Sequence, residues 1–302
     1  MSDENGEEVL PHAREYDFLM RHLYAPYQRV DIDGVPEDLA RLYDRVEQTW
    51  LTLGQTDPHW SVITSEAFRK ETVETQLEHF LAMGQENVDR VEATFARLGL
   101  DFGTVKTVID FGCGVGRVSA AFSSRGCNVT GVDISEAHLA LARNHFEKAG
   151  LEGADFVKLT TLSDLDELPQ VDLVYSLIVL QHNPPPLIAM ILRHLLRRVR
   201  QGGYTFFQVP TYKNGYSYLL EEDLNSQPGD MEMHVLPQAA VFQILKEEGF
   251  SLLEMTEDAS CWDPDFRSQV YLAQKAPCPP GWGIKPKPSV VRKKAQKKSF
   301  LS

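Results

Sequence analysis

Short, almost uninterrupted apolar runs recur through the middle of the chain, at residues 105–111, 128–132, 155–159, 171–177 and 204–209. Strands buried on both faces of a parallel sheet show such runs, whereas a strand with one wet face alternates apolar and polar residues. Segments with apolar residues at helical spacing separate the runs, at 117–122, 134–151 and 187–199. This alternation predicts a doubly wound α/β fold with right-handed crossovers and a mostly parallel sheet.

The region before the first run, residues 12–103, is predicted to form a helical extension. Apolar residues recur at helical spacing at 39–46, and further helices are expected over 66–83 and 86–98. The sequence TDPHWSV, at 56–62, favours a turn between them. Aromatic residues of this region, among them Tyr24, Trp50 and Trp60, are interpreted as packing residues.

The pattern changes again after the fifth run. Residues 211–236 interleave aromatic and acidic side chains and are interpreted as an insertion or lid. A helix over 237–248 and strands over 250–255 and 269–274 follow. The sheet-bearing domain is therefore predicted to span residues 104–275.

Composition places the chain among soluble globular proteins. Its 302 residues are 43% hydrophobic and 24% charged. No apolar run reaches the roughly 18 residues that span a bilayer, and the acidic N-terminus lacks the basic and apolar regions of a signal peptide. The four cysteines are scattered without a CxxC pair, which favours free thiols in the cytoplasm and disfavours a metal site; they are Cys113, Cys127, Cys261 and Cys278.

Charge is distributed unevenly around a net value of −13. Residues 1–11 are polar and acidic, and residues 276–302 contain seven Lys or Arg, several prolines and no acid. Both segments are predicted to be unfolded, because they have little apolar surface to bury. The acidic remainder repels phosphate backbones, which disfavours nucleic acid as a partner.

One stretch, residues 105–133, combines the features of a nucleoside-binding turn. The first run leads into Gly112, Gly114 and Gly116, and the second run ends at Asp133. Glycine lets a backbone turn sharply and approach a ligand, and the helix that follows directs free N–H groups at it. A carboxylate at the tip of the second strand can accept two hydrogen bonds from a ribose diol. The stretch therefore predicts a nucleoside-cofactor pocket.

The motif residues discriminate between cofactors. The dinucleotide pattern G-x-G-x-x-G/A fits imperfectly, because Arg117 or Ser119 stands at its last position. Asp110, just before the turn, is placed to meet a ligand ammonium. The sequence DFGCGVGR resembles the first motif of class I S-adenosylmethionine (SAM)-dependent methyltransferases, and VTGVDIS resembles their second. SLIVLQHNPPP, FFQVPTY and MHVLP resemble segments of a bacterial small-molecule subgroup, so the resemblance spans roughly residues 56–275.

The resemblance carries structural and functional expectations. It implies a seven-stranded sheet whose last strand is inserted antiparallel, and an N-terminal extension that covers the cofactor or, alternatively, is a plain structural cap. It implies transfer of the SAM methyl group to oxygen or nitrogen of a small-molecule or sugar-like acceptor. A non-catalytic SAM-binding regulatory or interaction module is the alternative. A nicotinamide-dependent oxidoreductase is disfavoured by the imperfect glycine pattern. A nucleic-acid methyltransferase is disfavoured because no aromatic residue follows Asn183-Pro184-Pro185.

Candidate site residues follow from the rule that open α/β sheets bind ligands beyond the carboxyl ends of their strands. Gln181, Tyr212 and Tyr216 are candidates for acceptor contacts. His182 and His234 are candidate general bases, with His182 alternatively a turn residue that hydrogen-bonds backbone. The resemblance places the adenine edge at Leu162 and Ser163. The cofactor candidates together are Asp110, Gly112, Gly114, Gly116, Asp133, Ile134, Leu162, Ser163 and Leu177.

Overall fold

The computed structural model of the protein describes residues 27–227, 229, 231–261 and 263–276. The predictions made for residues 1–11, for the beginning of the helical extension, including Tyr24, and for the tail beyond residue 276 therefore lie outside the described residues. Within the described part, no helix is long and apolar enough to cross a membrane.

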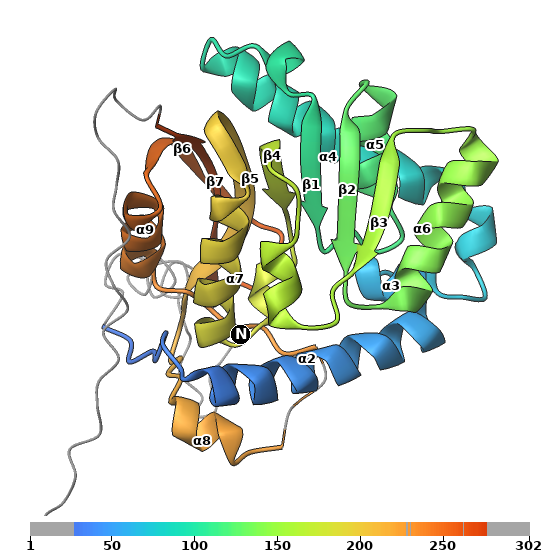
Figure 1. Cartoon of the computed structure of the whole chain (residues 1–302). Helices are drawn as coiled ribbons and strands as arrows, with labels where there is room; N and C mark the ends of the chain where they lie inside the picture. Colours follow the sequence, from blue (N-terminus) through green and yellow to red (C-terminus); the bar gives the residue numbers. More distant parts are fainter. Residues whose placement is uncertain (1–26, 228, 230, 262, 277–302) are drawn as a thin grey trace, which may run out of the picture.

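A seven-stranded sheet in the order β3-β2-β1-β4-β5-β7-β6 forms the centre of the fold (Figure 1). Neighbours from β3 to β5 pair in parallel, and β7 lies antiparallel between β5 and β6. The α/β class, the number of strands and the antiparallel insertion are confirmed. The strands are β1 Thr107–Phe111, β2 Asn128–Asp133, β3 Ala154–Lys158, β4 Val171–Ser176, β5 Val199–Lys213, β6 Phe250–Asp258 and β7 Phe266–Lys275.

Helices cover both faces of the sheet (Figure 1). The α4 and α5 helices pack on one face through Val88, Phe95 and Phe122, and α7 and α9 pack on the other. The α-helices are α2 Pro36–Thr56, α3 Pro58–Val62, α4 Leu77–Arg97, α5 Arg117–Ser124, α6 Glu136–Ala149, α7 Pro185–Arg197, α8 Leu220–Leu224 and α9 Gln238–Glu247. Short 3₁₀ turns lie at η1 Glu66–Phe68, η2 Val73–Thr75, η3 Phe102–Thr104, η4 Leu162–Asp166 and η5 Leu180–His182.

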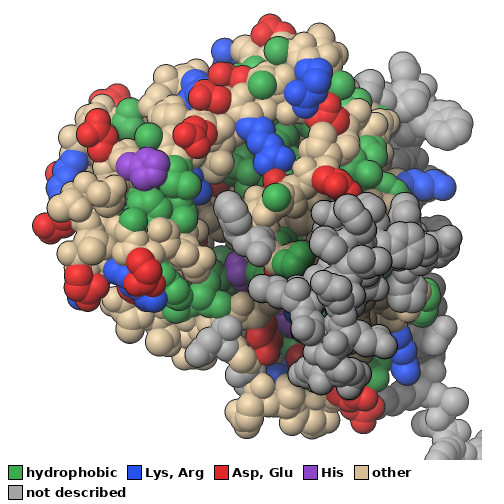
Figure 2. Space-filling model, turned by 180° about the vertical axis from the view of Figure 1, so that it is seen from behind, with side chains coloured by type: hydrophobic (Ala, Val, Ile, Leu, Met, Phe, Trp, Pro, Cys, Tyr) green, Lys and Arg blue, Asp and Glu red, His purple; other side chains and the backbone are tan. Residues whose placement is uncertain are grey.

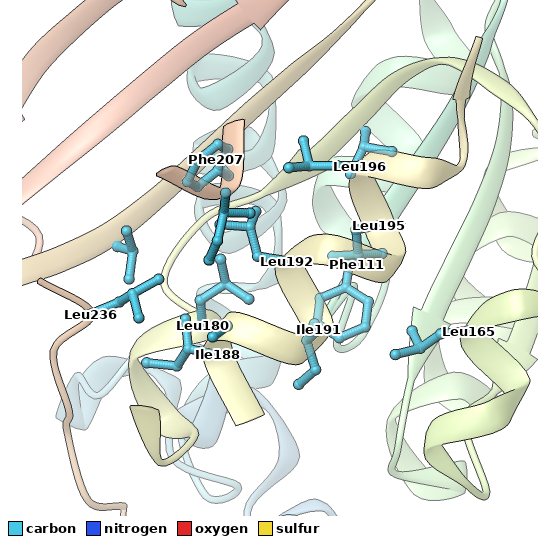
Figure 3. Close-up of a cluster of buried hydrophobic side chains, with 14 of the residues drawn as sticks. Phe111, Leu165, Leu180, Ile188, Ile191, Leu192, Leu195, Leu196, Phe207 and Leu236 are labelled. Atoms are coloured by element: carbon cyan, nitrogen blue, oxygen red, sulfur yellow. The ribbon is translucent and has the colours of Figure 1, made fainter. Parts of the chain in front are cut away.

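The larger hydrophobic core lies between the sheet and α7. Leucine and isoleucine side chains of α7 meet Phe111 of β1 and Phe207 of β5, with Leu236 closing one side (Figure 3). Prolines at the start of α7 fit the first helical turn, where no backbone N–H is needed. Full burial of each large apolar side chain contributes about 1.5–3 kcal/mol. This packing fixes the loop between β4 and α7, which contains His182.

The N-terminal extension differs from the expected helix boundaries. Instead of two helices over 66–83 and 86–98, one continuous α4 follows two 3₁₀ turns. The Thr72 hydroxyl bonds the carbonyls of Glu66, Ala67 and Arg69, which competes with regular helix there. Gly84 does not interrupt α4, because it serves close helix packing: a Cβ there would overlap the Arg117 carbonyl. The expected turn at 56–62 contains the short helix α3.

The fifth strand is longer than predicted. It begins at Val199, passes through Gly202, whose φ of 79° breaks the apolar pattern, and continues to Lys213. β5 pairs with β7 over most of this length, and these backbone hydrogen bonds explain why the strand continues beyond the apolar run. The stretch predicted as a lid therefore begins as sheet and contains α8. The Arg45 guanidinium of α2 bonds the Asp223 and Leu224 carbonyls there.

Candidate functional site

A cavity of about 440 Å³ opens at the carboxyl ends of β1, β2 and β4. Helices α2 and α3 contribute Trp50 and Val62 to its lining, so the N-terminal extension helps to form the site. In the view from behind, acidic and basic side chains are interspersed with hydrophobic ones over the part of this face that is not grey (Figure 2). The lining residues already singled out from the sequence are Asp110, Gly112, Gly114, Asp133, Ile134, Leu177, Gln181 and His182.

The glycine turn connects β1 to α5. Gly112, Gly114 and Gly116 have φ of 74°, 53° and 79°, a region that side chains rarely adopt. A Cβ at Gly114 would lie 2.7 Å from the Val62 side chain, and one at Gly112 would overlap Val179. Both glycines line the cavity, so their close approach to a ligand stays a prediction, although an added Cβ would first meet the side chain of Val179 or Val62. Glycine is needed here for turn geometry and packing, and the cavity lies alongside.

Asp133 ends β2 and lines the cavity beside this turn. Its Oδ2 accepts a 2.9 Å hydrogen bond from the Gly114 N–H, and its Oδ1 accepts one of 2.9 Å from the Ser135 N–H. A carboxylate offers about four acceptor positions, so two remain for a ligand. The backbone bonds fix the orientation of this carboxylate and leave it able to accept a diol.

Three polar side chains of the cavity lining differ in charge: Asp110 and Tyr175 are buried and Arg117 is half-buried. Asp110 is 2% exposed and accepts a 2.6 Å bond from the Ser119 hydroxyl; burial raises its pKa to about 6. Arg117 and Tyr175 also line the cavity, and the Arg117 Nε and the Tyr175 hydroxyl are buried without hydrogen-bond partners. Unpaired buried donors are costly, which points to partners supplied by a ligand. Arg117 was predicted only as a mismatch to the dinucleotide pattern. Tyr175 was not predicted, because it is a polar side chain within an apolar run.

His182 lies in η5, after β4, and forms part of the cavity wall. Its Nδ1 lies 3.2 Å from the Glu232 carbonyl, which can only accept, so Nδ1 carries the proton and Nε2 presents a lone pair. The ring packs edge-on against Trp50 with centroids 5.2 Å apart. Burial lowers the His182 pKa to about 4, so the imidazole is neutral at physiological pH.

The second candidate base, His234, lies outside this cavity. Its Nδ1 is 3.0 Å from the Tyr216 hydroxyl, and its Nε2 is 3.4 Å from a Glu232 carboxylate oxygen. Both ring nitrogens therefore have protein partners. The Tyr216 hydroxyl is thus bonded to His234, and Tyr216 does not line the cavity. Tyr212 does not line it either, and its ring lies under the Arg267 guanidinium. The structure thus removes these three residues from the cavity wall.

Three of the predicted cofactor residues also lie outside the cavity lining. Gly116 caps α5, where a Cβ would meet Ala142 of α6 at 2.8 Å. Leu162 packs against the hydrophobic core. The Ser163 hydroxyl bonds that of Thr161, within η4. The loop after β3 contributes Leu159 to the lining instead.

Further lining residues come from segments far apart in the sequence. Trp50, which sequence patterns suggest is a packing residue, borders the cavity together with Met231, Met233 and Cys261. The two methionines lie in the stretch interpreted as a lid, and the alternation of polar and apolar residues gives no signal for them. Only contacts across the tertiary fold bring these four side chains together.

Comparison with known proteins places this geometry in a family context. Residues 108–203 match the family model of a methyltransferase domain. A ubiquinone biosynthesis O-methyltransferase of Pseudomonas paraeruginosa (strain DSM 24068 / PA7) is 40% identical over 115 residues, which cover 38% of this chain and 48% of that protein. The protein of the same description from Stutzerimonas stutzeri (strain A1501) is 43% identical over 103 residues, covering 34% and 43%. The chain thus spans about half the length of the curated relatives it matches.

Solved structures support the fold. The magnesium protoporphyrin IX methyltransferase of Synechocystis PCC 6803, with bound S-adenosylhomocysteine (SAH), superposes with a TM-score of 0.55 at 22% identity, covering 78% of this chain and 100% of that one. A [4+2]-cyclase, SpnF, superposes with a TM-score of 0.50 at 13% identity, covering 83% of this chain and 100% of that chain. These likenesses establish a shared architecture.

Proposed function

Since residues 108–203 of this chain form a class I SAM-dependent methyltransferase domain, we propose that the protein binds SAM and transfers its methyl group to an oxygen or nitrogen atom of a small molecule. The observation that carries the proposal is Asp133, fixed beside the glycine turn by bonds from the Gly114 and Ser135 amides. The ubiquinone O-methyltransferases that match part of the chain support this reaction class.

The charged groups of the cavity fit SAM. The amino acid end of SAM has an ammonium, for which Asp110 is the partner, and a carboxylate, for which the unpaired Arg117 Nε and Tyr175 hydroxyl are partners. The ribose diol suits the two open acceptor positions of Asp133. The Asp110 carboxylate, directly before the turn, disfavours a pyrophosphate there, which argues against a nicotinamide dinucleotide.

The chain's residues then have separate tasks. When bound, SAM supplies an electrophilic methyl group on a sulfonium. Asp110, Arg117 and Asp133 would hold the two ends of the cofactor, and helices α2 and α3 would exclude water from the cavity. His182 would accept the acceptor's proton at Nε2. Holding both reactants in line is the chief source of catalysis in such a transfer, with the base adding to it.

Calorimetric titration with SAM, SAH and NADH tests the binding step. SAM and SAH should bind and NADH should not. Asp133→Ala should weaken SAM binding by about 1.5–3 kcal/mol, roughly 10- to 150-fold, because hydrogen bonds to a charged acceptor are lost. Glu136→Ala is the matched control, since this neighbouring carboxylate is exposed and pairs with Arg143. Unchanged SAM affinity in a folded Asp133→Ala protein would overturn the site assignment.

Turnover separates an enzyme from a binding module. An enzyme should convert SAM to SAH in the presence of a suitable acceptor, whereas a non-catalytic module should bind SAM without releasing SAH. SAH formation, measured with a panel of small hydroxyl and amine compounds, is therefore the second readout.

A further inference from the structure

The charged side chains of the cavity lie at the end formed by the glycine turn and β2; we call the opposite end, where the methyl acceptor would bind, the acceptor end. The charged lining residues are Asp110, Arg117 and Asp133, which belong to the glycine turn and the end of β2. The described lining residues from α2, from the loop after β4 and from residues 231–261 carry no Lys, Arg, Asp or Glu. A charged acceptor would therefore be desolvated at that end without a partner, at a cost that proteins avoid. The acceptor end suits an uncharged molecule.

Large, polarisable side chains form the wall at this end. We call Trp50, Ile178, Met231, Met233 and Cys261 the acceptor wall. Thioether sulfur makes favourable contacts with aromatic rings, and indole packs against other rings edge-on or offset. A wall of one indole, two thioethers, a thiol and an aliphatic chain favours a flat aromatic ligand. A sugar would instead need a polar partner for each hydroxyl that it buries.

The backbone of the wall is held in an unusual conformation. Among the described residues, Ile178 and Met231 are the two non-glycine residues with positive φ, at 58° and 48°, and both line the cavity. Positive φ is strained for a β-branched residue such as Ile178, and backbone strain of this kind is found most often at ligand sites. The fully buried Gln208 stabilises it, because its Oε1 accepts the Ile178 N–H at 2.9 Å.

The buried side-chain amides of Gln181 and Gln208, next to the acceptor wall, hydrogen-bond to each other. Gln208 Nε2 donates to Gln181 Oε1 at 3.0 Å and to Ser268 Oγ at 2.6 Å. Gln181 Nε2 lies 3.2 Å from Met233 Sδ and 3.4 Å from His182 Nε2. The last contact is long, so an incoming hydroxyl can replace it. His182 Nε2 is thus an acceptor at this end that a ligand can use, since Nδ1 is bonded to the Glu232 carbonyl.

We propose that the acceptor is an uncharged aromatic molecule that presents a hydroxyl group to His182 Nε2, with its ring against the acceptor wall. This inference rests on the proposed function and deepens it. The phenolic oxygen forms a bond to the methyl carbon as the methyl–sulfur bond breaks, with that electron pair remaining on sulfur. The phenolic proton passes to His182 Nε2, so the products are an aryl methyl ether, SAH and a proton.

Binding to the SAH-loaded protein tests the acceptor class. Calorimetry compares 2-naphthol with 2-naphthoate, which adds a negative charge, and with methyl β-glucopyranoside, a neutral polyol. We expect 2-naphthol to bind at least tenfold more tightly than either. Equal or tighter binding of the carboxylate or the glycoside would overturn the inference, as would failure of 2-naphthol to bind a protein that does bind SAH. Failure of SAH itself to bind would instead refute the proposed function.

A charge placed in the wall gives an independent test. Met233→Lys should weaken 2-naphthol binding at least tenfold and strengthen 2-naphthoate binding, because the ammonium supplies the missing partner. Met255→Lys is the matched control: Met255 is an exposed methionine on β6, outside the cavity, and its replacement makes the same change in net charge. If both lysine variants shift binding equally, the acceptor wall does not contact the ligand.

Discussion

At the scale of single residues, burial changes what His182 can do. A histidine with the ordinary pKa of about 6.5 would lose its base function below pH 6, and the sequence alone leads to that expectation. The buried setting of His182 lowers the pKa to about 4. A lower pKa keeps the imidazole unprotonated in mildly acidic solution, so base function persists there, although a weaker base drives proton transfer less strongly.

Two consequences are measurable with 2-naphthol as acceptor. His182→Ala should lower kcat by about 10²–10⁴-fold and leave SAM affinity nearly unchanged. The kcat of the parent protein should stay level from pH 8 to about 5 and fall as the pH approaches 4. His194→Ala is the control, because the His194 side chain on α7 pairs with Asp166 of η4 and does not line the cavity. Full activity in His182→Ala would leave His182 a turn residue.

At the scale of elements, two glycines let the N-terminal helices reach the loops of the site. A Cβ at Gly54 of α2 would overlap the Ser135 hydroxyl, which caps α6. A Cβ at Gly84 of α4 would overlap the Arg117 carbonyl, at the start of α5. The extension is therefore packed against the loops that follow β1 and β2, which explains how Trp50 and Val62 come to line the cavity.

Gly84→Val tests this contact. Overpacking against a backbone atom should lower the free energy of unfolding by about 1–3 kcal/mol. Because Arg117 lines the cavity, SAM affinity should fall as well. Ala82→Val is the control on the exposed side of the same helix, where only the helix propensity changes, by at most about 0.7 kcal/mol. Similar losses in both variants, measured by urea unfolding, would show that the close contact is unimportant.

At the scale of the whole molecule, buried histidines link stability to pH. Burial, followed by the neighbouring His145 and His138, lowers the His59 pKa to about 4, and burial lowers the His145 pKa as well. Below pH 6.5 the native state therefore binds fewer protons at these histidines than the unfolded state does. The free energy of unfolding consequently falls as the pH drops from 6.5 toward 4. Asp110 acts in the opposite sense, because burial raises its pKa to about 6 and its protonation favours the native state below that value.

His59→Gln should therefore flatten the pH dependence of the whole protein's stability. Between pH 6.5 and 5 the slope should fall by about 1 kcal/mol per pH unit, close to the value for one proton. Urea unfolding at several pH values measures this slope. His79→Gln, an exposed position on α4, should leave the slope unchanged. An unaltered slope in His59→Gln would mean that this histidine is not kept neutral by the fold.

The sequence by itself determined the sheet and the glycine turn. Apolar runs mark strands buried on both faces, and Gly112, Gly114 and Asp133 lie within one strand–turn–helix–strand unit whose geometry is local. Local geometry depends on backbone preferences and on period, both of which are written in neighbouring residues. The order of the elements also restricts the crossovers, so the parallel core follows without knowledge of side-chain contacts.

Only the tertiary structure decided which side chains share the cavity. Trp50 and Met233, separated by more than half of the chain, line the same cavity. His234, next to Met233 in sequence, instead bonds the Tyr216 hydroxyl and does not line it. The lowered pKa of His182 likewise comes from burial among distant segments. Such placements depend on packing between residues far apart in the chain, which no local pattern records, and on desolvation, which exists only once the fold has closed.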